Sequence, residues 1–82
     1  MGETPVQLPE VLVHRDTAQN WRWKRTTPHG EIVAGSSEGC SDQQHCRIQA
    51  LTRNEPPYVL IVLDHLGAIT ETEEITRKRD IP

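Results

Sequence analysis

Phenylalanine is absent from this 82-residue sequence, and its aromatic residues are limited to two tryptophans and one tyrosine. Hydrophobic residues make up only 34% of the chain. A chain of this length buries only about 60–65% of the surface that it exposes when unfolded, so its margin of stability is thin. We therefore expect one small domain whose core is built from valine, isoleucine and leucine around the few aromatic rings.

Long hydrophobic runs are missing as well. The longest run, Val59 to Leu63, falls far short of the roughly 20 apolar residues that span a bilayer. Residues 1–5 have neither the basic start nor the apolar block of a signal peptide, and Val6 stands where myristoylation requires serine or threonine. We therefore expect a cytoplasmic protein with no membrane contact, in which Cys40 and Cys46 are free thiols.

An excess of positive charge is also lacking. The formal net charge is -3 at pH 7, so the chain as a whole is not attracted to nucleic acid. The charges are unevenly placed, with a basic group at Arg22, Lys24 and Arg25 and an acidic group at Glu71, Glu73 and Glu74. Any basic binding surface must therefore be local.

The clearest pattern in the sequence is that of a β-hairpin. Residues 11–15 suit a short first strand, and residues 20–27 alternate with the period of two that a one-sided strand shows. The two faces of that second strand are Trp21, Trp23 and Arg25 on one side and Arg22, Lys24 and Thr26 on the other. Gly30 allows a turn, after which residues 31–37 form the returning strand.

A helix is predicted over residues 42–53, with Ser41 as its N-cap and Gln44 at the capping-box position. It must end before Pro56 and Pro57, because each proline disfavours helix in the residue before it. Residues 58–64 are rich in β-branched side chains and predict a strand that is buried on both faces or sealed against a partner chain.

The sequence thus predicts an α+β fold of order β-β-β-α-β-(β), with a small antiparallel sheet and one helix packed on one face. We expect a flexible leader at 1–9, a single domain at 10–72 that ends with a short fifth strand at 68–72, and a charged tail at 73–82. The predicted core consists of Val11, Val13, Trp21, Trp23, Ile32, Ala34, Ile48, Leu51, Leu60 and Val62.

The run from Trp21 to Ser41 resembles the repeat of the YegP-like family, a domain of unknown function (DUF1508). The matching positions are Trp21, Arg22, Trp23, Gly30, Glu31, Ile32, Val33, Ala34, Ser37, Glu38, Gly39 and Ser41. The resemblance covers about residues 11–54 and implies a three-stranded antiparallel sheet with one helix, in proteins that occur as tandem repeats or homodimers. It implies no biochemical activity.

The departures from the family pattern concern single positions. Cys40 replaces the family's tyrosine, His29 replaces its turn asparagine, and the usual lysine is missing at Gln43 and Gln44. Residues 55–82 lie outside the motif. A single repeat leaves one sheet face open, which a second chain or the strand at 58–63 would cover.

Catalytic and metal sites are weakly indicated. Cys40, His45 and Cys46 are possible zinc ligands, with His29 or His65 as a fourth, but their spacing is not a standard one. On a helix, His45 and Cys46 also point about 100° apart. Cys40 precedes the predicted helix, whose dipole favours thiolate, yet the sequence fixes no acid or base beside it. We therefore expect no metal, no cofactor and no enzymatic activity.

Two binding functions remain open. Nucleic-acid binding would use the basic residues Arg22, Lys24 and Arg25 of the hairpin. The tryptophans alternate with Arg22 and Lys24 along the strand and so face the other way, which favours a role for the rings in the core.

We favour a non-enzymatic protein-interaction module that forms a homodimer, because the core is thin and residues 58–63 are exceptionally apolar. The predicted interface residues are Tyr58, Val59, Ile61 and Leu63. The nucleic-acid-binding module remains the alternative.

Overall fold

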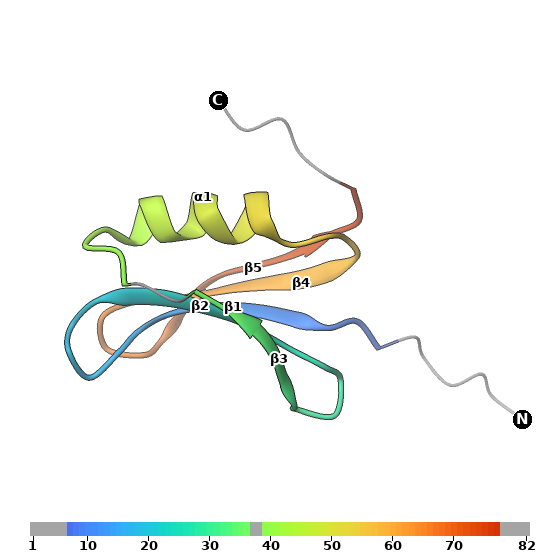
Figure 1. Ribbon diagram of the computed structural model, residues 1–82, viewed down its shortest axis with the longest axis horizontal. Coiled ribbons are helices and arrows are strands. Elements are labelled where there is room, and N and C mark those ends of the chain that lie inside the picture. The colour runs from blue at the N-terminus through green and yellow to red at the C-terminus, as the bar shows by residue number, and fades with distance from the viewer. Residues whose placement is uncertain (1–6, 37–38, 78–82) are drawn as a thin grey trace, which may run out of the picture.

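The computed structural model describes residues 7–36 and 39–77 (Figure 1). Its elements are β1 (Glu10–Arg15), β2 (Trp21–Thr26), β3 (Ile32–Gly35), α1 (Gln43–Arg53), β4 (Tyr58–Leu63) and β5 (Ile69–Ile75). The strands form one five-stranded sheet in the order β3-β2-β1-β4-β5, and α1 packs on one face of it. The predicted α+β fold with a single helix on one face is confirmed.

The sheet is mixed, and the expectation of a fully antiparallel sheet is wrong at one pair of strands. Three pairs are antiparallel (β1 with β2, β2 with β3, and β4 with β5), whereas β1 and β4 pair in parallel, with Val11 opposite Leu60. Short turns join the antiparallel neighbours. From the edge strand β3 the chain instead returns to the centre of the sheet through α1. Such a helical crossover allows β4 to pair in parallel with β1.

Two aspartates stabilise the β1–β2 and β4–β5 turns, which lie at the same end of the sheet because β1 and β4 are parallel. The Oδ1 atom of Asp16 accepts hydrogen bonds from the backbone N–H groups of Ala18 and Asn20, both at 2.9 Å, after β1. Asp64 repeats this arrangement after β4, where its Oδ1 accepts from the N–H groups of Leu66 and Ala68 at 2.8 and 2.9 Å. Each carboxylate thus provides a hydrogen-bond acceptor for backbone N–H groups of the turn.

The helix begins one residue later than expected. Asp42, not Ser41, is the N-cap, and its side chain accepts a hydrogen bond from the backbone N–H of His45 at 3.3 Å. Aspartate and serine are about equally good caps, so composition alone does not separate the two positions. The C-cap is Asn54, whose Nδ2 donates to the Ala50 carbonyl at 2.7 Å, and the helix ends before Pro56 as expected.

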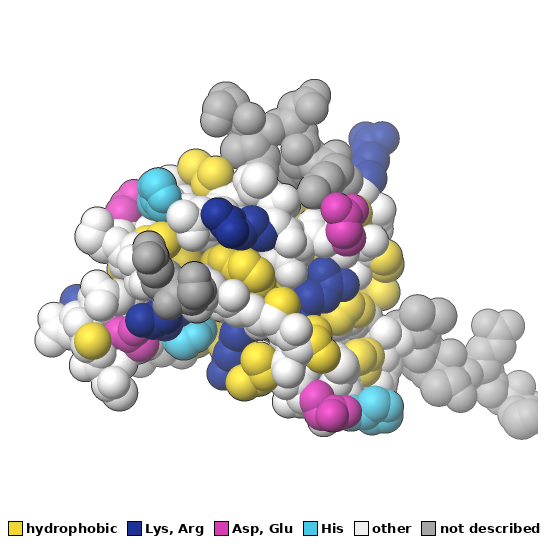
Figure 2. Space-filling view, in the orientation of Figure 1, with side chains coloured by type: hydrophobic (Ala, Val, Ile, Leu, Met, Phe, Trp, Pro, Cys, Tyr) yellow, Lys and Arg dark blue, Asp and Glu magenta, His cyan; other side chains and the backbone are white. Residues whose placement is uncertain are grey.

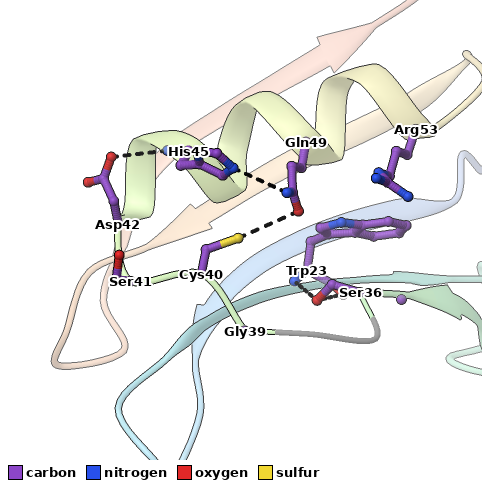
Figure 3. Close-up of a pocket in the computed structure, with 10 residues that line it drawn as sticks. Trp23, Ser36, Gly39, Cys40, Ser41, Asp42, His45, Gln49 and Arg53 are labelled. Atoms are coloured by element: carbon purple, nitrogen blue, oxygen red, sulfur yellow. Dashed lines mark hydrogen bonds between the residues drawn. The ribbon is translucent and has the colours of Figure 1, made fainter.

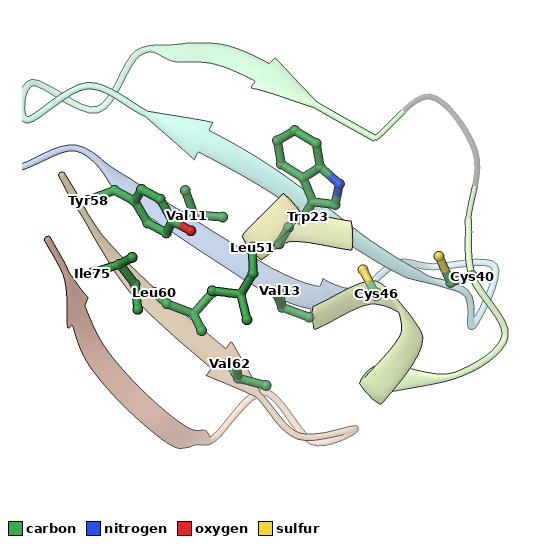
Figure 4. Close-up of a cluster of buried hydrophobic side chains, with 11 residues drawn as sticks. Val11, Val13, Trp23, Cys40, Cys46, Leu51, Tyr58, Leu60, Val62 and Ile75 are labelled. Atoms are coloured by element: carbon green, nitrogen blue, oxygen red, sulfur yellow. The ribbon is translucent and has the colours of Figure 1, made fainter. Parts of the chain in front are cut away.

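The core lies between α1 and the sheet (Figure 4). Six predicted core residues are confirmed as buried, namely Val11, Val13, Trp23, Leu51, Leu60 and Val62. Five residues outside the predicted core list are also buried, namely Cys40, Cys46, Ala50, Tyr58 and Ile75. Trp21 and Ile48 are only partly buried.

Two predicted core residues are exposed. Ile32 is 66% exposed, and Ala34 is also at the surface. Both belong to β3, which is the outermost strand and turns away from the helix in Figure 1. Alternation along β3 does not bury a face, because no helix lies above that edge.

The strand β4 alternates in burial along its length. Its residues Tyr58, Leu60 and Val62 are buried beneath the helix, and the residues between them are half-buried on the opposite face. The expectation of a strand fully buried on both faces therefore fails within one copy of the chain.

The strand β5 reaches Ile75, which is 3% exposed and pairs with Tyr58, so folded structure continues beyond residue 72. The predicted boundary between the domain and the tail, at residue 73, is therefore too early in the sequence, because β5 continues to Ile75. Residues 1–6 of the expected leader and 78–82 of the tail lie outside the described residues.

Candidate functional site

The three basic residues predicted to bind nucleic acid do not share one surface. Arg22 and Lys24 point away from the helix, whereas Arg25 lies on the helix side of β2. The Arg25 guanidinium stands 5.6 Å from the centre of the Tyr58 ring and donates a 2.9 Å hydrogen bond to the Glu55 carbonyl. Arg25 therefore ties β2 to the segment after the helix.

Arg22 is likewise engaged within the domain. Its Nε donates to Asp16 Oδ2, and this hydrogen bond is the main reason that the pKa of Asp16 is lowered from its ordinary 3.8. Figure 2 shows, on the face that it presents, basic side chains scattered among uncharged and acidic ones. Of the predicted set, Lys24 is the residue whose charge is least committed to internal contacts.

The sheet face opposite the helix carries an apolar strip that we call the outer sheet face. It consists of Leu12 on β1, the half-buried β4 residues Val59, Ile61 and Leu63, and Ile69 on β5. Leu12 and Ile61 are direct neighbours across the parallel pair, and Leu63 lies opposite Ile69, which is 64% exposed.

The predicted interface residues are split between the two faces of the sheet. Val59, Ile61 and Leu63 lie together on the outer sheet face. Tyr58 is only 1% exposed and belongs to the core on the helix side, so it is removed from the surface that the other three form. A two-residue period along β4 requires this division.

Charges of opposite sign border the outer sheet face. Lys24 stands beside Leu12 on the β2 side, and Glu74 stands beside Val59 on the β5 side. Glu10 lies on the same face at the start of β1, also beside Val59. The strip is therefore apolar at Leu12, Ile61 and Leu63, basic along the β2 margin at Lys24, and acidic at the end that holds Val59.

The thiols and imidazoles considered as metal ligands are dispersed. Cys46 is fully buried in the core, and burial raises the pKa of its thiol to about 12. His29 and His65 lie in exposed turns at separate hairpins. Within residues 7–36 and 39–77, no three histidine, cysteine or acidic side chains gather closely enough to hold a metal ion.

A polar pocket of about 450 Å³ opens between α1 and the β2–β3 hairpin (Figure 3). One wall is a stripe along the helix formed by Asp42, His45, Gln49 and Arg53. These residues are three or four positions apart and so share one helix face. The floor and the opposite wall include Trp23 and Ser36. This pocket was not predicted from the sequence, where its one local signal was the polar spacing along the helix.

The indole of Trp23 is the unusual group in this pocket. Trp23 is 5% exposed, and its Nε1–H is buried without a hydrogen-bond acceptor among the described residues. The backbone N–H of Trp23, by contrast, donates to Ser36 Oγ at 3.2 Å. Buried donors are paired in the large majority of cases, so this one marks a position where an acceptor is missing.

No helix in the described part of the chain combines the length and the apolar character that crossing a membrane requires. Comparison with known proteins gives no match to a family model, to a curated protein or to a solved structure. The resemblance to the YegP-like family therefore stays a prediction, and function is inferred below from the geometry alone.

Proposed function

We propose that this domain is a non-enzymatic protein-interaction module that forms a homodimer through its outer sheet face. The observation that carries the proposal is the pair Leu12 and Ile61, flanked by Val59 and Leu63, on the side of the sheet that the helix leaves uncovered. An uncovered apolar sheet face is typical of a surface that packs against a second layer.

The charged margins favour a second copy of the same chain as that layer. A twofold axis parallel to the strands, passing between β1 and β4, places β2 of one copy over β5 of the other. The Lys24 margin of each copy then lies near the Glu74 margin of its partner. An axis perpendicular to the strands would instead place Lys24 over Lys24, which is unfavourable. We therefore expect the parallel axis.

Light scattering tests the dimer. Wild type is expected at about twice the chain mass of 9.3 kDa. Ile61→Lys places a charge in the middle of the apolar strip and is expected to weaken the dimer at least about tenfold. Leu66→Lys is the matched control, because Leu66 is 82% exposed in a turn and the change leaves the strip intact. A wild-type monomer at high concentration would contradict the proposal.

Charge reversal tests the orientation. Lys24→Glu and Glu74→Lys are each expected to weaken the dimer, and the double variant is expected to recover part of the loss, because each interface then regains opposite charges. If wild type is a dimer and the double variant shows no recovery, the orientation is wrong while self-association stands.

Nucleic-acid binding is the less supported function. Arg22 pairs with Asp16, and Arg25 lies on the other face, so Lys24 would act without the two neighbours that the sequence suggested. A gel shift at low salt that Lys24→Glu abolishes would favour this function over the homodimer.

A further inference from the structure

The pocket beside α1 contains a donor without an acceptor and a guanidinium without an anion. Trp23 Nε1–H is buried and has no acceptor among the described residues. Arg53 lies on the helix wall of the same pocket, where it is exposed, and makes no ion pair within residues 7–36 and 39–77. Figure 3 shows the Arg53 side chain reaching down from the last turn of the helix toward the indole of Trp23.

The remaining polar groups of the pocket favour an anionic ligand. Ser36 supplies a hydroxyl group beside Trp23, whose backbone N–H donates to it, and Gln49 supplies an amide, whereas Ser41 lies at the other end of the pocket in Figure 3. The acid that lines the pocket, Asp42, sits at the far end in Figure 3, and its carboxylate already caps the helix by accepting from His45 N–H. Hydrogen-bond donors and one positive charge therefore surround the end of the pocket that holds Trp23.

We propose that this pocket binds a small organic carboxylate. One carboxylate oxygen accepts from Trp23 Nε1–H and the other from the Arg53 guanidinium, an interaction that is stronger than a hydrogen bond between neutral groups. The volume of about 450 Å³ is within the range of small-molecule sites. A carboxylate accepts from the buried indole N–H and pairs with the charge of the exposed Arg53 at once, which a neutral acceptor or a cation does not.

Gln49 controls access to the indole nitrogen. Its side chain lies above the ring in Figure 3 and makes two hydrogen bonds, at 3.2 Å to His45 Nε2 and at 3.5 Å from Cys40 Sγ. The thiol is a weak donor and His45 is exposed to water, so the amide turns aside at low cost. The ligand oxygen then takes the position that the amide leaves.

The indole N–H resonances report directly on this contact. The chain has two tryptophans, so a proton–nitrogen correlation spectrum contains two indole signals, and Trp21→Phe assigns them. We expect benzoate and succinate to move the Trp23 signal downfield in a saturable manner and to leave the Trp21 signal nearly unchanged. Benzamide and succinamide are the neutral controls and are expected to have little effect. Equal shifts with the amides, or no saturable shift with either carboxylate at about 10 mM, overturn the proposal.

Variants identify the partners of the carboxylate. Arg53→Gln is expected to weaken benzoate binding about tenfold or more, because it removes the charged hydrogen bond. Arg77→Gln, an exposed change after β5 at the opposite edge of the sheet, is the matched control and is expected to have no effect. Gln49→Ala removes the cover and is expected to retain the carboxylate-specific shift. Equal binding by Arg53→Gln and Arg77→Gln overturns the assignment.

Discussion

Arg47 and Glu71 form a two-pronged ion pair that fastens α1 to β5. Arg47 Nε lies 2.8 Å from Glu71 Oε1, and Nη2 lies 2.6 Å from Oε2. The hydrogen bonds to Glu71 are the main reason that the pKa of Arg47 is raised. The helix is therefore held over the acidic edge strand by a contact of fixed geometry, in addition to apolar packing on β1 and β2.

Removing this ion pair is expected to lower the free energy of unfolding by about 1 kcal/mol, because the pair is bidentate but still 21% and 32% exposed at its two side chains. Arg47→Met and Glu71→Gln, singly and together, measure the coupling by denaturant unfolding. Arg53→Met is the control, since Arg53 lies on the same helix and makes no ion pair within the described residues. Additive effects of the two changes would show that the pair contributes nothing.

The hairpin and the helix followed from local sequence, whereas the strand order did not. Alternation of tryptophan with basic residues predicted β2, and the proline pair predicted the end of α1. The parallel pairing of β1 with β4 depends on where α1 delivers the chain, and no local pattern encodes that position. Ile32 looks like a core residue by its alternation and is exposed because it lies on the edge strand.

The end of the domain and the polar pocket were missed for different reasons. Ile75 follows a run of glutamate and threonine whose spacing also suits a helix, so the strand was indistinguishable from a charged tail. The unpaired Trp23 Nε1–H depends on which side chains surround the ring after folding. The spacing of Asp42, His45, Gln49 and Arg53 predicts a polar side of the helix, but it does not show which part of the chain lies opposite that side.

Asp16 should make stability depend on pH at the acid end. The pKa of its carboxyl is lowered from 3.8 by the hydrogen bond from Arg22, then by backbone N–H groups. Its contribution is therefore complete above about pH 4 and is lost as the pH falls through the lower folded-state value. Asp16→Asn should lower the melting temperature at neutral pH, and the difference from wild type should shrink at about pH 3.

Added salt distinguishes the contribution of the Arg22 guanidinium to the effect of Asp16→Asn from that of the backbone N–H groups. The pKa of Asp64 is also lowered, mainly by the hydrogen bond from the Ala68 backbone N–H, and Asp64 has no guanidinium partner within the described residues. The effect of Asp16→Asn should therefore decrease with added salt more than the effect of Asp64→Asn. An equal salt dependence would mean that Arg22 contributes little.

Cys46 is expected to resist thiol reagents in the folded protein. It is fully buried, and burial raises the pKa of its thiol from 9.0 to about 12. At pH 8 the thiolate then makes up on the order of one in ten thousand molecules, and the thiolate is the reactive form. In a Cys40→Ala background, iodoacetamide should modify Cys46 slowly in buffer and rapidly in denaturant. Rapid modification under both conditions would show that the helix opens easily.

Gly39 is expected to tolerate no side chain, because the chain passes close to Asn20 there. A Cβ atom at position 39 would lie 2.5 Å from the Cβ of Asn20. The approach is fixed by two backbone hydrogen bonds between Trp21 and Cys40, at 2.7 and 2.8 Å. Gly39→Ala should therefore lower the free energy of unfolding by about 1–3 kcal/mol in denaturant titrations.

The cause of that loss is tested by removing the other side chain. Asn20→Gly deletes the atom that a Cβ at position 39 would meet, so Gly39→Ala should cost clearly less in the Asn20→Gly background than in wild type. Gly30→Ala is the control: its φ of +93° disfavours a side chain although the space around it is open, so its cost reflects backbone conformation alone. That cost should be the same in both backgrounds. If Asn20→Gly relieves both changes equally, or neither, contact with Asn20 is not the reason that glycine is required at position 39.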